Sequence, residues 1–285
     1  MNALAAPLLW LEKPMWVRKL SRKLIVLKLG GSVVTRKEKP FTANLPAIRR
    51  LAREISDAEL SQLIIVHGGG SFGHPLAKQY ALKEGYQGDP TQLFGFSKTR
   101  QAMMTLNKLV VDALIQRNIS VVAVSPSSFI VTKSGRIATM IDEPLKKLLQ
   151  TGFVPVLYGD AVLDFDLGFT ILSGDQLAAY LAVQFSAEQI VMGIDVDGVF
   201  TADPRKEESA SLIRHCTLQE LKKMHTRIVD TSSTDVTGGM LGKLIELTPA
   251  IEKGISAFIV NASKPKNVYK ALRGESVTGT LIQKT

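Results

Sequence analysis

Leu63-Ile64-Ile65-Val66-His67-Gly68-Gly69-Gly70-Ser71-Phe72-Gly73-His74 is the stretch around which the chain is organised. The four branched apolar residues 63–66 predict a strand that is buried on both faces, as in a parallel sheet. Residues 68–70 carry no Cβ atoms, so a bound group can approach several backbone N–H donors at once. A helix that begins near Pro75 would direct the positive end of its dipole to the same place. The stretch therefore predicts an anion-binding loop at the end of a central strand.

The spacing of Gly68, Gly70 and Gly73 also matches G-x-G-x-x-G, the fingerprint of dinucleotide-binding folds. That interpretation requires a second strand, ending in an acidic residue, about 20 residues later. Residues 83–90 form a polar loop instead, and no β-rich run occurs before residues 121–124. The missing context disfavours a nicotinamide cofactor.

Lys28 interrupts a second apolar strand, residues 24–29, directly before Gly30-Gly31-Ser32. A buried lysine is costly unless an anion meets it, because burial disfavours the charged form. A lysine that reaches solvent from the end of a strand is the ordinary alternative. The paired glycines that follow favour a contact with phosphate. Lys37 and Lys39 come next, in a polar loop where either is compatible with a solvated charge.

The order of the elements predicts an α/β fold. Asn44 caps a predicted helix that leads from the first glycine loop to the strand at 63–66. A strand, a helix and a parallel strand make a right-handed crossover, so both glycine loops lie at the carboxyl edge of one sheet, and Lys28 and His74 face one crevice. Further strands are predicted at residues 121–124, 129–132, 154–158, 170–172, 190–194, 257–260 and, at a sheet edge, 278–282, with helices at 75–82, 94–117, 145–149 and 176–185.

Charge disfavours a nucleic-acid-binding function. The 285 residues include 35 basic and 26 acidic ones, which gives a net charge of +9. The basic residues are spread along the chain rather than gathered in runs, and aromatic residues do not alternate with them. General solubility explains most of this surplus, and phosphorylated small molecules explain the rest as well as RNA would.

Cysteine and histidine usage disfavours a metal centre. The single cysteine, Cys216, excludes an intrachain disulfide and fits a reducing cytoplasm. The four histidines lack the spacing of zinc ligands, so no protein-bound metal is expected. No apolar run reaches the about 18 residues needed to span a bilayer, and no membrane partner is expected. Residues 1–22 are expected to be a disordered extension, unless translation starts at Met15.

Two later segments combine glycines with charged residues. Asp195-Val196-Asp197-Gly198 follows a predicted strand and suits a metal or a ribose, although a turn with two solvated acids has the same composition. Residues 235–243 form a glycine turn ahead of a helix and end in Lys243. They are no P-loop, because Leu244 stands where that motif requires Ser or Thr.

With these segments in place, residues 24–285 resemble the amino acid kinase superfamily. The resemblance rests on Lys-Leu-Gly-Gly-Ser at 28–32, on Asp-Val-Asp-Gly-Val-Phe-Thr-Ala-Asp-Pro-Arg at 195–205 and on Thr-Gly-Gly-Met-x-x-Lys at 237–243. Within the superfamily, residues 67–75 and Pro-Ser-Ser-Phe at 126–129 are similar to isopentenyl phosphate kinases. Acetylglutamate kinases share His-Gly-Gly-Gly but are expected to differ at the four residues that follow.

The resemblance implies a three-layer αβα sandwich with a mostly parallel central sheet. It also implies an acceptor-phosphate lobe at 23–163, an ATP lobe at 164–285 and a homodimer. The implied reaction is the phosphorylation of isopentenyl phosphate by ATP with Mg²⁺, in the cytoplasm and as part of isoprenoid biosynthesis. An acceptor phosphate is largely ionised at neutral pH and needs no general base. The chemistry then depends on positioning and charge compensation between two anions.

Residue roles follow from the resemblance, position by position. Lys37 is expected to stabilise the transferring group, His74 to contact the acceptor phosphate, and Asp175 to orient two lysines. The nucleotide side is expected to include Lys28, Leu29, Gly30, Gly31, Ser32, Gly70, Asp195, Asp197, Gly238 and Lys243, and the substrate side Gly69 and Gly159. Tyr80, Phe96 and Met103 follow the anion loop and are candidates for the wall around an apolar tail. Whether Lys39 assists Lys37 stays open.

Two alternatives remain. A kinase of the same fold could act on another phosphate or phosphonate, such as a longer prenyl phosphate or fosfomycin, with the same catalytic centre. A non-catalytic protein could use the fold to hold a nucleotide or an oxyanion. The joint presence of Lys28, Lys37, Asp175 and Lys243 disfavours this second alternative, because binding alone needs no oriented lysine pair.

Overall fold

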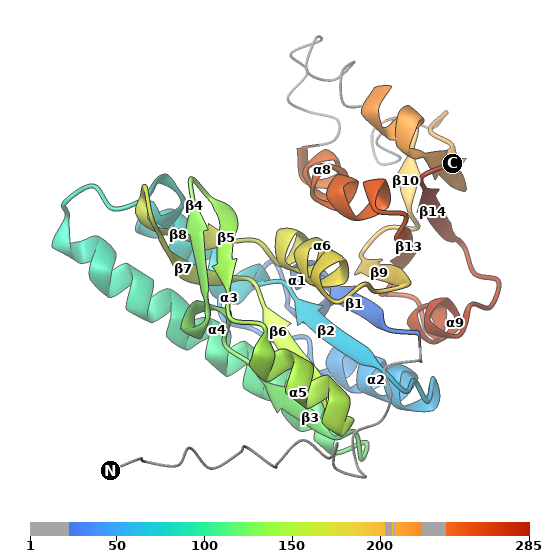
Figure 1. The fold of residues 1–285 in the computed structure, drawn as a ribbon, viewed down its shortest axis with the longest axis horizontal. Coiled ribbons are helices and arrows are strands. Elements are labelled where there is room, and N and C mark those ends of the chain that lie inside the picture. The colour runs from blue at the N-terminus through green and yellow to red at the C-terminus, as the bar shows by residue number, and fades with distance from the viewer. Residues whose placement is uncertain (1–22, 203–206, 208, 224–237) are drawn as a thin grey trace, which may run out of the picture.

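An eight-stranded sheet forms the centre of the structure (Figure 1), a computed structural model that describes residues 23–202, 207, 209–223 and 238–285. Its strands, in chain order, are β1 (Ile25–Leu29), β2 (Leu63–His67), β3 (Val121–Ala123), β6 (Val154–Tyr158), β9 (Gln189–Ile194), β12 (His215–Thr217), β13 (Ser256–Asn261) and β14 (Gly279–Gln283). The predictions for residues 1–22, including the start at Met15, fall outside the described residues. So do Thr237 and residues 203–205 of the motifs named above.

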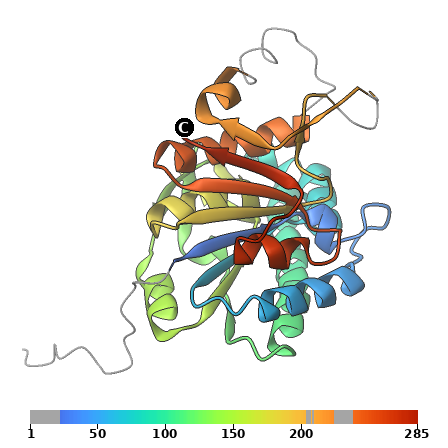
Figure 2. The ribbon, with the colours of Figure 1, turned by 90° about the vertical axis from the view of Figure 1, so that its right-hand side faces the viewer.

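The spatial order of the central sheet is β12-β14-β13-β9-β1-β2-β6-β3, and its strands lie side by side in Figure 2. The six strands from β13 to β3 pair in parallel, and β14 runs antiparallel to β13. The mostly parallel sheet is therefore confirmed. The prediction that residues 278–282 form an edge strand is wrong, because β12 pairs outside β14. The three residues of β12 are too few for a strand pattern to be seen in the sequence.

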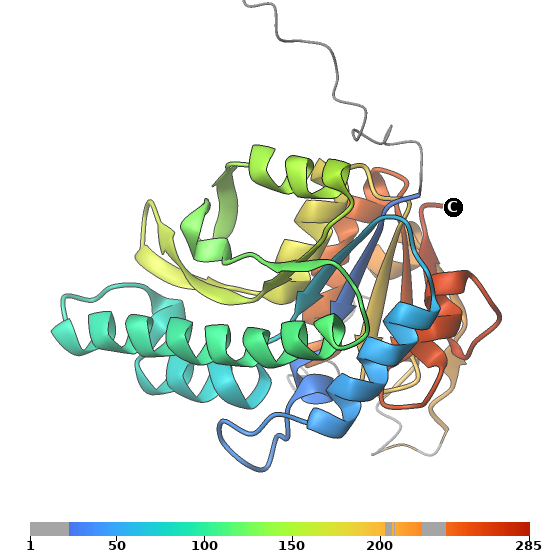
Figure 3. The ribbon, with the colours of Figure 1, turned by 90° about the horizontal axis from the view of Figure 1, so that it is seen from below.

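Helices cover both faces of this sheet, which confirms the three-layer αβα sandwich (Figure 3). Along β1, Val26 packs with one layer, and Ile25 and Leu27 pack with the other. The first layer contains α5 (Glu143–Thr151), α6 (Gly174–Gln184) and α8 (Gly238–Glu252), and the second contains α2 (Leu45–Asp57), α3 (Gly70–Gln79), α4 (Pro90–Ile115) and α9 (Asn267–Arg273). Short helices occur at α1 (Gly31–Val34), η1 (Leu82–Glu84) and η2 (Pro126–Ser128).

A second sheet, with the order β5-β4-β7-β8, consists of β4 (Ile130–Lys133), β5 (Arg136–Met140), β7 (Asp160–Asp164) and β8 (Gly168–Leu172). A two-stranded sheet joins β10 (Val199–Phe200) and β11 (Leu212–Ile213). The lobe boundary expected between residues 163 and 164 falls inside β7, whose antiparallel partner is β8.

The sequence missed β7 because acidic residues stand at both of its ends. The carboxylate of Asp164 is held in place by backbone N–H donors, including Gly135 N at 2.8 Å and Leu167 N at 2.9 Å. Burial raises the pKa of Asp164, but these donors outweigh it and lower that pKa to about 2. Donors from its own turn and from the β4–β5 hairpin thus make an acidic residue acceptable in this strand. Ser134 and Gly135, both with positive φ, form the turn before β5. Such a turn is a hairpin signal in the sequence, but no strand was predicted at β5.

Helix α3 begins at Gly70, five residues before the predicted start near Pro75. Proline inside a helix leaves the carbonyl four residues earlier without its helical donor. Here that carbonyl belongs to Ser71, and it accepts a hydrogen bond from Phe41 N at 3.0 Å. The loop that carries Lys37 supplies this donor, so Pro75 is tolerated in the sixth helical position. The glycine loop is consequently the first turn of α3 itself.

None of the helices that the structure describes is long and apolar enough to cross a membrane.

Candidate functional site

The glycine turns after β1, β2 and β6 meet at the carboxyl edge of the central sheet, beside the end of β9. The backbone N–H of Gly68 donates to Leu29 O at 2.9 Å, which joins the turns after β1 and β2. Gly159 N donates to His67 O at 3.0 Å and adds the turn after β6, and Gly30 N donates to Gly193 O at 2.7 Å at the end of β9. The predicted convergence of the two glycine loops is confirmed.

Gly70 and Gly31 pack too closely for any side chain. Gly70 has a φ of +47°, and a Cβ atom there would collide with the Thr35 hydroxyl and with Gly31 O. A Cβ atom on Gly31 would collide with the backbone of Gly70. Thr35 Oγ1 bridges the same two turns, since it donates to Gly31 O at 2.7 Å and accepts from Ser71 N at 3.0 Å. Glycine is therefore required here by sterics as well as by conformation.

A cavity of about 150 Å³ lies at this edge, between α3, α4, β8 and α6. Its wall has three parts: a basic side with Lys28, His74 and Lys243, backbone from Gly31, Gly68, Gly69, Gly73, Gly159 and Gly174, and apolar side chains from Met103, Ile171 and Leu172. Lys28 and His74 thus face one crevice, as predicted. A basic end beside an apolar wall suits a small anion that carries a hydrocarbon group.

Asp175 connects the two lysines of the basic side. Its Oδ1 lies 2.6 Å from the Nζ of Lys28, and its Oδ2 accepts a hydrogen bond from the Nζ of Lys243 at 2.8 Å. Lys28 is at the end of β1, Lys243 is on α8, and Asp175 is in the first turn of α6. The side chain of Ser173 caps α6 by accepting from Gln176 N at 3.0 Å, which fixes where this helix begins.

Burial and charge together set the protonation of this cluster. Burial lowers the pKa of Lys28, which Asp175 opposes and Lys243 reinforces. For Asp175, burial raises the pKa, but the two lysines outweigh it, so the net shift is downward and the carboxylate stays ionised. Two cations thus share one anion. The excess positive charge suits phosphate oxygens at the mouth of the cavity.

His74 lies on α3 with its side chain on the cavity wall. Burial lowers its pKa, and the positive charges of Lys243 and Lys28 lower it further. An anion bound beside it would oppose both lysines and favour the protonated imidazole. His74 is therefore suited to respond to a phosphate in this cavity.

The two acids after β9 are both paired with lysines. Asp195 accepts from the Nζ of Lys37 at 2.8 Å, and Asp197 lies 2.7 Å from the Nζ of Lys264. Burial raises the pKa of Asp195, but Lys37 and the Ser32 hydroxyl outweigh it and lower that pKa. Lys37 is half exposed and does not line the cavity that holds Lys28. Within the described part of the chain, no three His, Cys, Asp or Glu side chains gather as metal ligands.

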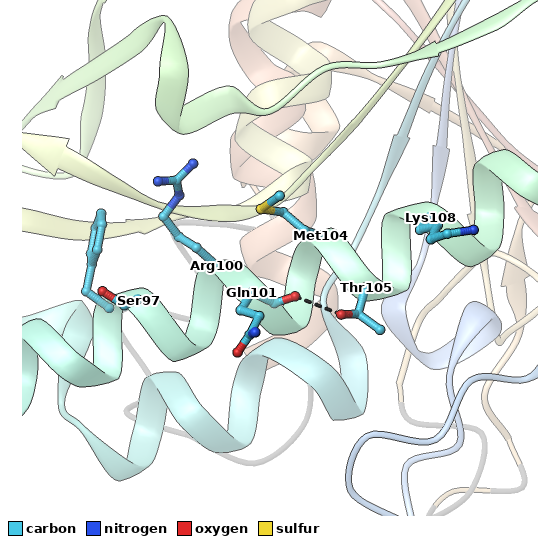
Figure 4. A pocket seen from close by; sticks show the side chains of 7 residues that line it. Ser97, Arg100, Gln101, Met104, Thr105 and Lys108 are labelled. Carbon is cyan, nitrogen blue, oxygen red and sulfur yellow. Dashed lines mark hydrogen bonds between the residues drawn. The ribbon is translucent and has the colours of Figure 1, made fainter.

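Of the three residues expected around an apolar tail, only Met103 lines the cavity. Its side chain is buried and packs against Gly69 and Gly73. Tyr80 packs over Gly95 instead. Phe96 lines a separate surface pocket along α4. Figure 4 shows Arg100 and Met104 of the same pocket. Tyr80 and Phe96 also pack with Phe169 and with Ile171, which itself lines the cavity. Their contact with an apolar tail stays a prediction.

The cavity wall also contains Thr99 and Asp160, which the sequence did not single out as site residues. Asp160 directly follows Gly159, a predicted substrate-side residue, so the sequence did indicate this part of the chain. Thr99 lies in the middle of α4 and carries no sequence signal. Of the remaining predicted residues, Gly70 is packed against Gly31, and Gly238 begins α8, the helix that carries Lys243.

Comparison with known proteins agrees with this geometry. The profile of the Amino acid kinase family matches residues 23–261. An isopentenyl phosphate kinase of Methanothermobacter thermautotrophicus is 42% identical over 266 residues, which cover 91% of this chain and 98% of that protein. An isopentenyl phosphate kinase of Methanocaldococcus jannaschii is 35% identical, again over 91% of this chain and 98% of that protein. The chain belongs to the isopentenyl phosphate kinase family, within the amino acid kinases.

Solved structures of the isopentenyl phosphate kinase family share the fold closely. One has a TM-score of 0.80 at 39% sequence identity, covering 91% of this chain and 100% of its own. A substrate complex of an isopentenyl phosphate kinase has a TM-score of 0.72 at 29% identity over the same share of this chain. A UMP kinase of Ureaplasma parvum, at 17% identity and a TM-score of 0.61, shares the fold alone.

Proposed function

We propose that this chain transfers the γ-phosphoryl group of ATP to isopentenyl phosphate and forms isopentenyl diphosphate and ADP, a step of isoprenoid biosynthesis. The observation that carries the proposal is the Lys28–Asp175–Lys243 cluster at one end of a cavity whose other wall is apolar. The family supports the same reaction, because its members with this name cover nearly the whole chain.

In the proposed reaction an oxygen of the acceptor phosphate attacks the γ-phosphorus of ATP. The new P–O bond forms as the bond from the γ-phosphorus to the bridging oxygen breaks, and ADP leaves with that electron pair. The acceptor oxygen is already ionised, so no base is needed. The obstacle is repulsion between two anions, and the residues of the site act by placing positive charge between them.

The lysines divide this work. Lys28 and Lys243, held by one carboxylate, are positioned for phosphate oxygens of ATP. His74, on the same basic side of the cavity, and the backbone of Gly69 and Gly159 are proposed to contact the acceptor phosphate. Lys37 is paired with Asp195 in this structure. We propose that its side chain moves to the transferring phosphoryl group when both substrates are bound.

Mg²⁺ is proposed on the nucleotide phosphates. This ion keeps several waters and usually takes one or two protein carboxylates beside substrate phosphates. When bound, the metal neutralises charge on the β- and γ-phosphates.

We propose ATP binding by residues 164–285 and acceptor binding by 23–163, a homodimer, and a cytoplasmic location. A cavity of about 150 Å³ favours a short tail over a longer prenyl chain.

An acceptor screen tests the proposed function. ADP release with ATP and Mg²⁺ is measured for isopentenyl, dimethylallyl and geranyl phosphates, for fosfomycin and without acceptor, with the product identified by ³¹P NMR. The highest kcat/KM is expected for isopentenyl phosphate. Turnover of another acceptor alone would support the alternative kinase, and no acceptor-dependent ADP release would support a non-catalytic binder.

A further inference from the structure

Thr99 and Asp160 line the cavity apart from the lysine cluster, and each has one side-chain oxygen that makes no hydrogen bond within the described part of the chain. Thr99 is 2% exposed and Asp160 is 1% exposed. Thr99 Oγ1 and Asp160 Oδ2 have no hydrogen-bond partner among the described residues. A buried polar atom without a partner is costly, and nearly all such atoms in native proteins are paired. Two of them on one cavity wall indicate a polar partner that enters the cavity.

The hydroxyl of Thr99 does not make the bond that helical hydroxyls usually make. On the same helix, Ser97 donates to Leu93 O at 3.1 Å and Thr105 donates to Gln101 O at 2.9 Å, four residues back. Figure 4 shows the Thr105 bond. Thr99 lacks the equivalent bond to Gly95 O. Its hydroxyl is therefore left without a hydrogen-bond partner among the described residues.

Only one oxygen of the Asp160 carboxylate makes a hydrogen bond of ordinary length with the described residues. Its Oδ1 accepts from Ala161 N at 2.9 Å, whereas Oδ2 lies 3.8 Å from Arg100 Nε, which is beyond hydrogen-bond distance. Burial raises the pKa of Asp160 to about 6, although Ser127 and Arg100 oppose this. Above that pH, Oδ2 is an ionised acceptor that makes no hydrogen bond of ordinary length with the described residues, although Ser127 and Arg100 lie beside the carboxylate.

Thr99 and Asp160 line the part of the cavity that would surround a carbon chain. Thr99 lies one helical turn before Met103 on α4, and Met103 packs against Gly69 and Gly73. Asp160 is the register partner of Leu172, another apolar residue of the wall. The two polar groups are thus set among the side chains that would contact a hydrocarbon tail.

We propose that Thr99 and Asp160 form a polar subsite for an O–H group inside the acceptor cavity. The group donates to Asp160 Oδ2 and accepts from the Thr99 hydroxyl. Its source is either a hydroxyl on the carbon chain of a short hydroxyalkyl monophosphate, or a water molecule beside a purely hydrocarbon chain. This inference rests on the proposed function and extends its substrate class.

The test compares two acceptors that differ by one added water across the double bond: isopentenyl phosphate and 3-hydroxy-3-methylbutyl phosphate. The kcat/KM of each is measured for the parent protein, for Thr99→Val and for Thr105→Val, the matched control on the outer side of α4. Thr99→Val is isosteric and removes no hydrogen bond, so thermal melting is expected to match the parent. Asp160→Asn, which keeps the shape of the side chain, serves as the second variant.

A substrate hydroxyl is the source if Thr99→Val and Asp160→Asn lower the ratio of kcat/KM for the hydroxylated acceptor to that for isopentenyl phosphate, on the order of 10-fold for Thr99→Val. Water is the source if both variants lower both values equally, while Thr105→Val does not. The subsite is refuted if Thr99→Val behaves like Thr105→Val with both acceptors. Parent turnover of isopentenyl phosphate reports separately on the proposed function.

Discussion

Lys28 and Asp175 form an ion pair with their Nζ and Oδ1 atoms 2.6 Å apart, and the side chain of Lys28 is only 3% exposed. A charge this buried depends on its partner, and the same carboxylate also holds Lys243. One side chain at the start of α6 therefore determines where both lysines lie. The position of Asp175 makes it the residue whose loss should affect both of them together.

Asp175→Asn is expected to lower kcat by on the order of 10²-fold, because both lysines lose the charge that orients them. It should also lower the free energy of unfolding by about 3 to 5 kcal/mol, since Lys28 keeps a buried charge without an anion. Asp142→Asn is the control, because Asp142 pairs with Lys146 on α5, away from the cavity. A coupled ADP assay and urea unfolding measure both effects. Equal kcat in the two variants would contradict the assignment.

Lys37→Ala is expected to lower turnover by on the order of 10²-fold and leave the fold intact. Its side chain is 58% exposed and pairs with Asp195, so little stability depends on it. Lys39→Ala, in the same loop, should retain most of its activity. Circular dichroism and the ADP assay test this pair. If the two variants lose activity equally, the loop contributes general charge rather than one positioned lysine.

Gly70→Ala should disrupt the junction of the glycine turns. It combines a φ of +47° with a collision against Thr35 and Gly31. Gly254→Ala provides the control, because Gly254 has a φ of +84° but no atom within 4 Å of the added Cβ. Gly254→Ala is expected to cost about 1 kcal/mol of stability, and Gly70→Ala considerably more. Equal melting temperatures of the two variants would show that the glycine turns can shift to accept a side chain at residue 70.

His67 and Asp160 are expected to change stability with pH in opposite directions. Burial lowers the pKa of His67 from 6.5 to about 4, so its contribution is present above pH 6.5 and is lost as the pH falls towards 4. Burial raises the pKa of Asp160 from 3.8 to about 6, so its contribution is present below pH 3.8 and is lost as the pH rises towards 6. Each pKa shift changes the free energy of unfolding by on the order of 3 kcal/mol. The two changes have opposite signs and largely cancel in the parent protein.

Removing one of the two groups should reveal the titration of the other in the pH dependence of the free energy of unfolding. Between pH 4 and 6, the free energy of unfolding of His67→Gln is expected to fall as the pH rises, and that of Asp160→Asn is expected to rise. Urea unfolding at several pH values measures both slopes against the parent. Two slopes equal to the parental one would mean that neither group titrates in this window.

The course of the central sheet was predictable because its strands are runs of apolar residues that end in glycines. Residues 63–66 and 24–29 predicted β2 and β1 within one residue at each end. The start of α3 was not predictable in the same way. The carbonyl that Pro75 leaves free is satisfied by Phe41, from a loop about thirty residues earlier in the chain, and no local pattern shows this.

The chain order of apolar runs and glycine turns by itself determined the α/β class, the meeting of the glycine loops and the crevice shared by Lys28 and His74. These follow from local backbone preferences and from the single hand of parallel crossovers. The resemblance to the kinase family led to the expectation that Asp175 orients Lys28 and Lys243, and the distances agree with it. Only the tertiary structure decided that Met103 rather than Phe96 lines the cavity, and that Thr99 and Asp160 line it with one polar atom each that makes no hydrogen bond to the residues the structure describes. Such relationships depend on the rotation of one element against another, and packing between distant segments sets that rotation.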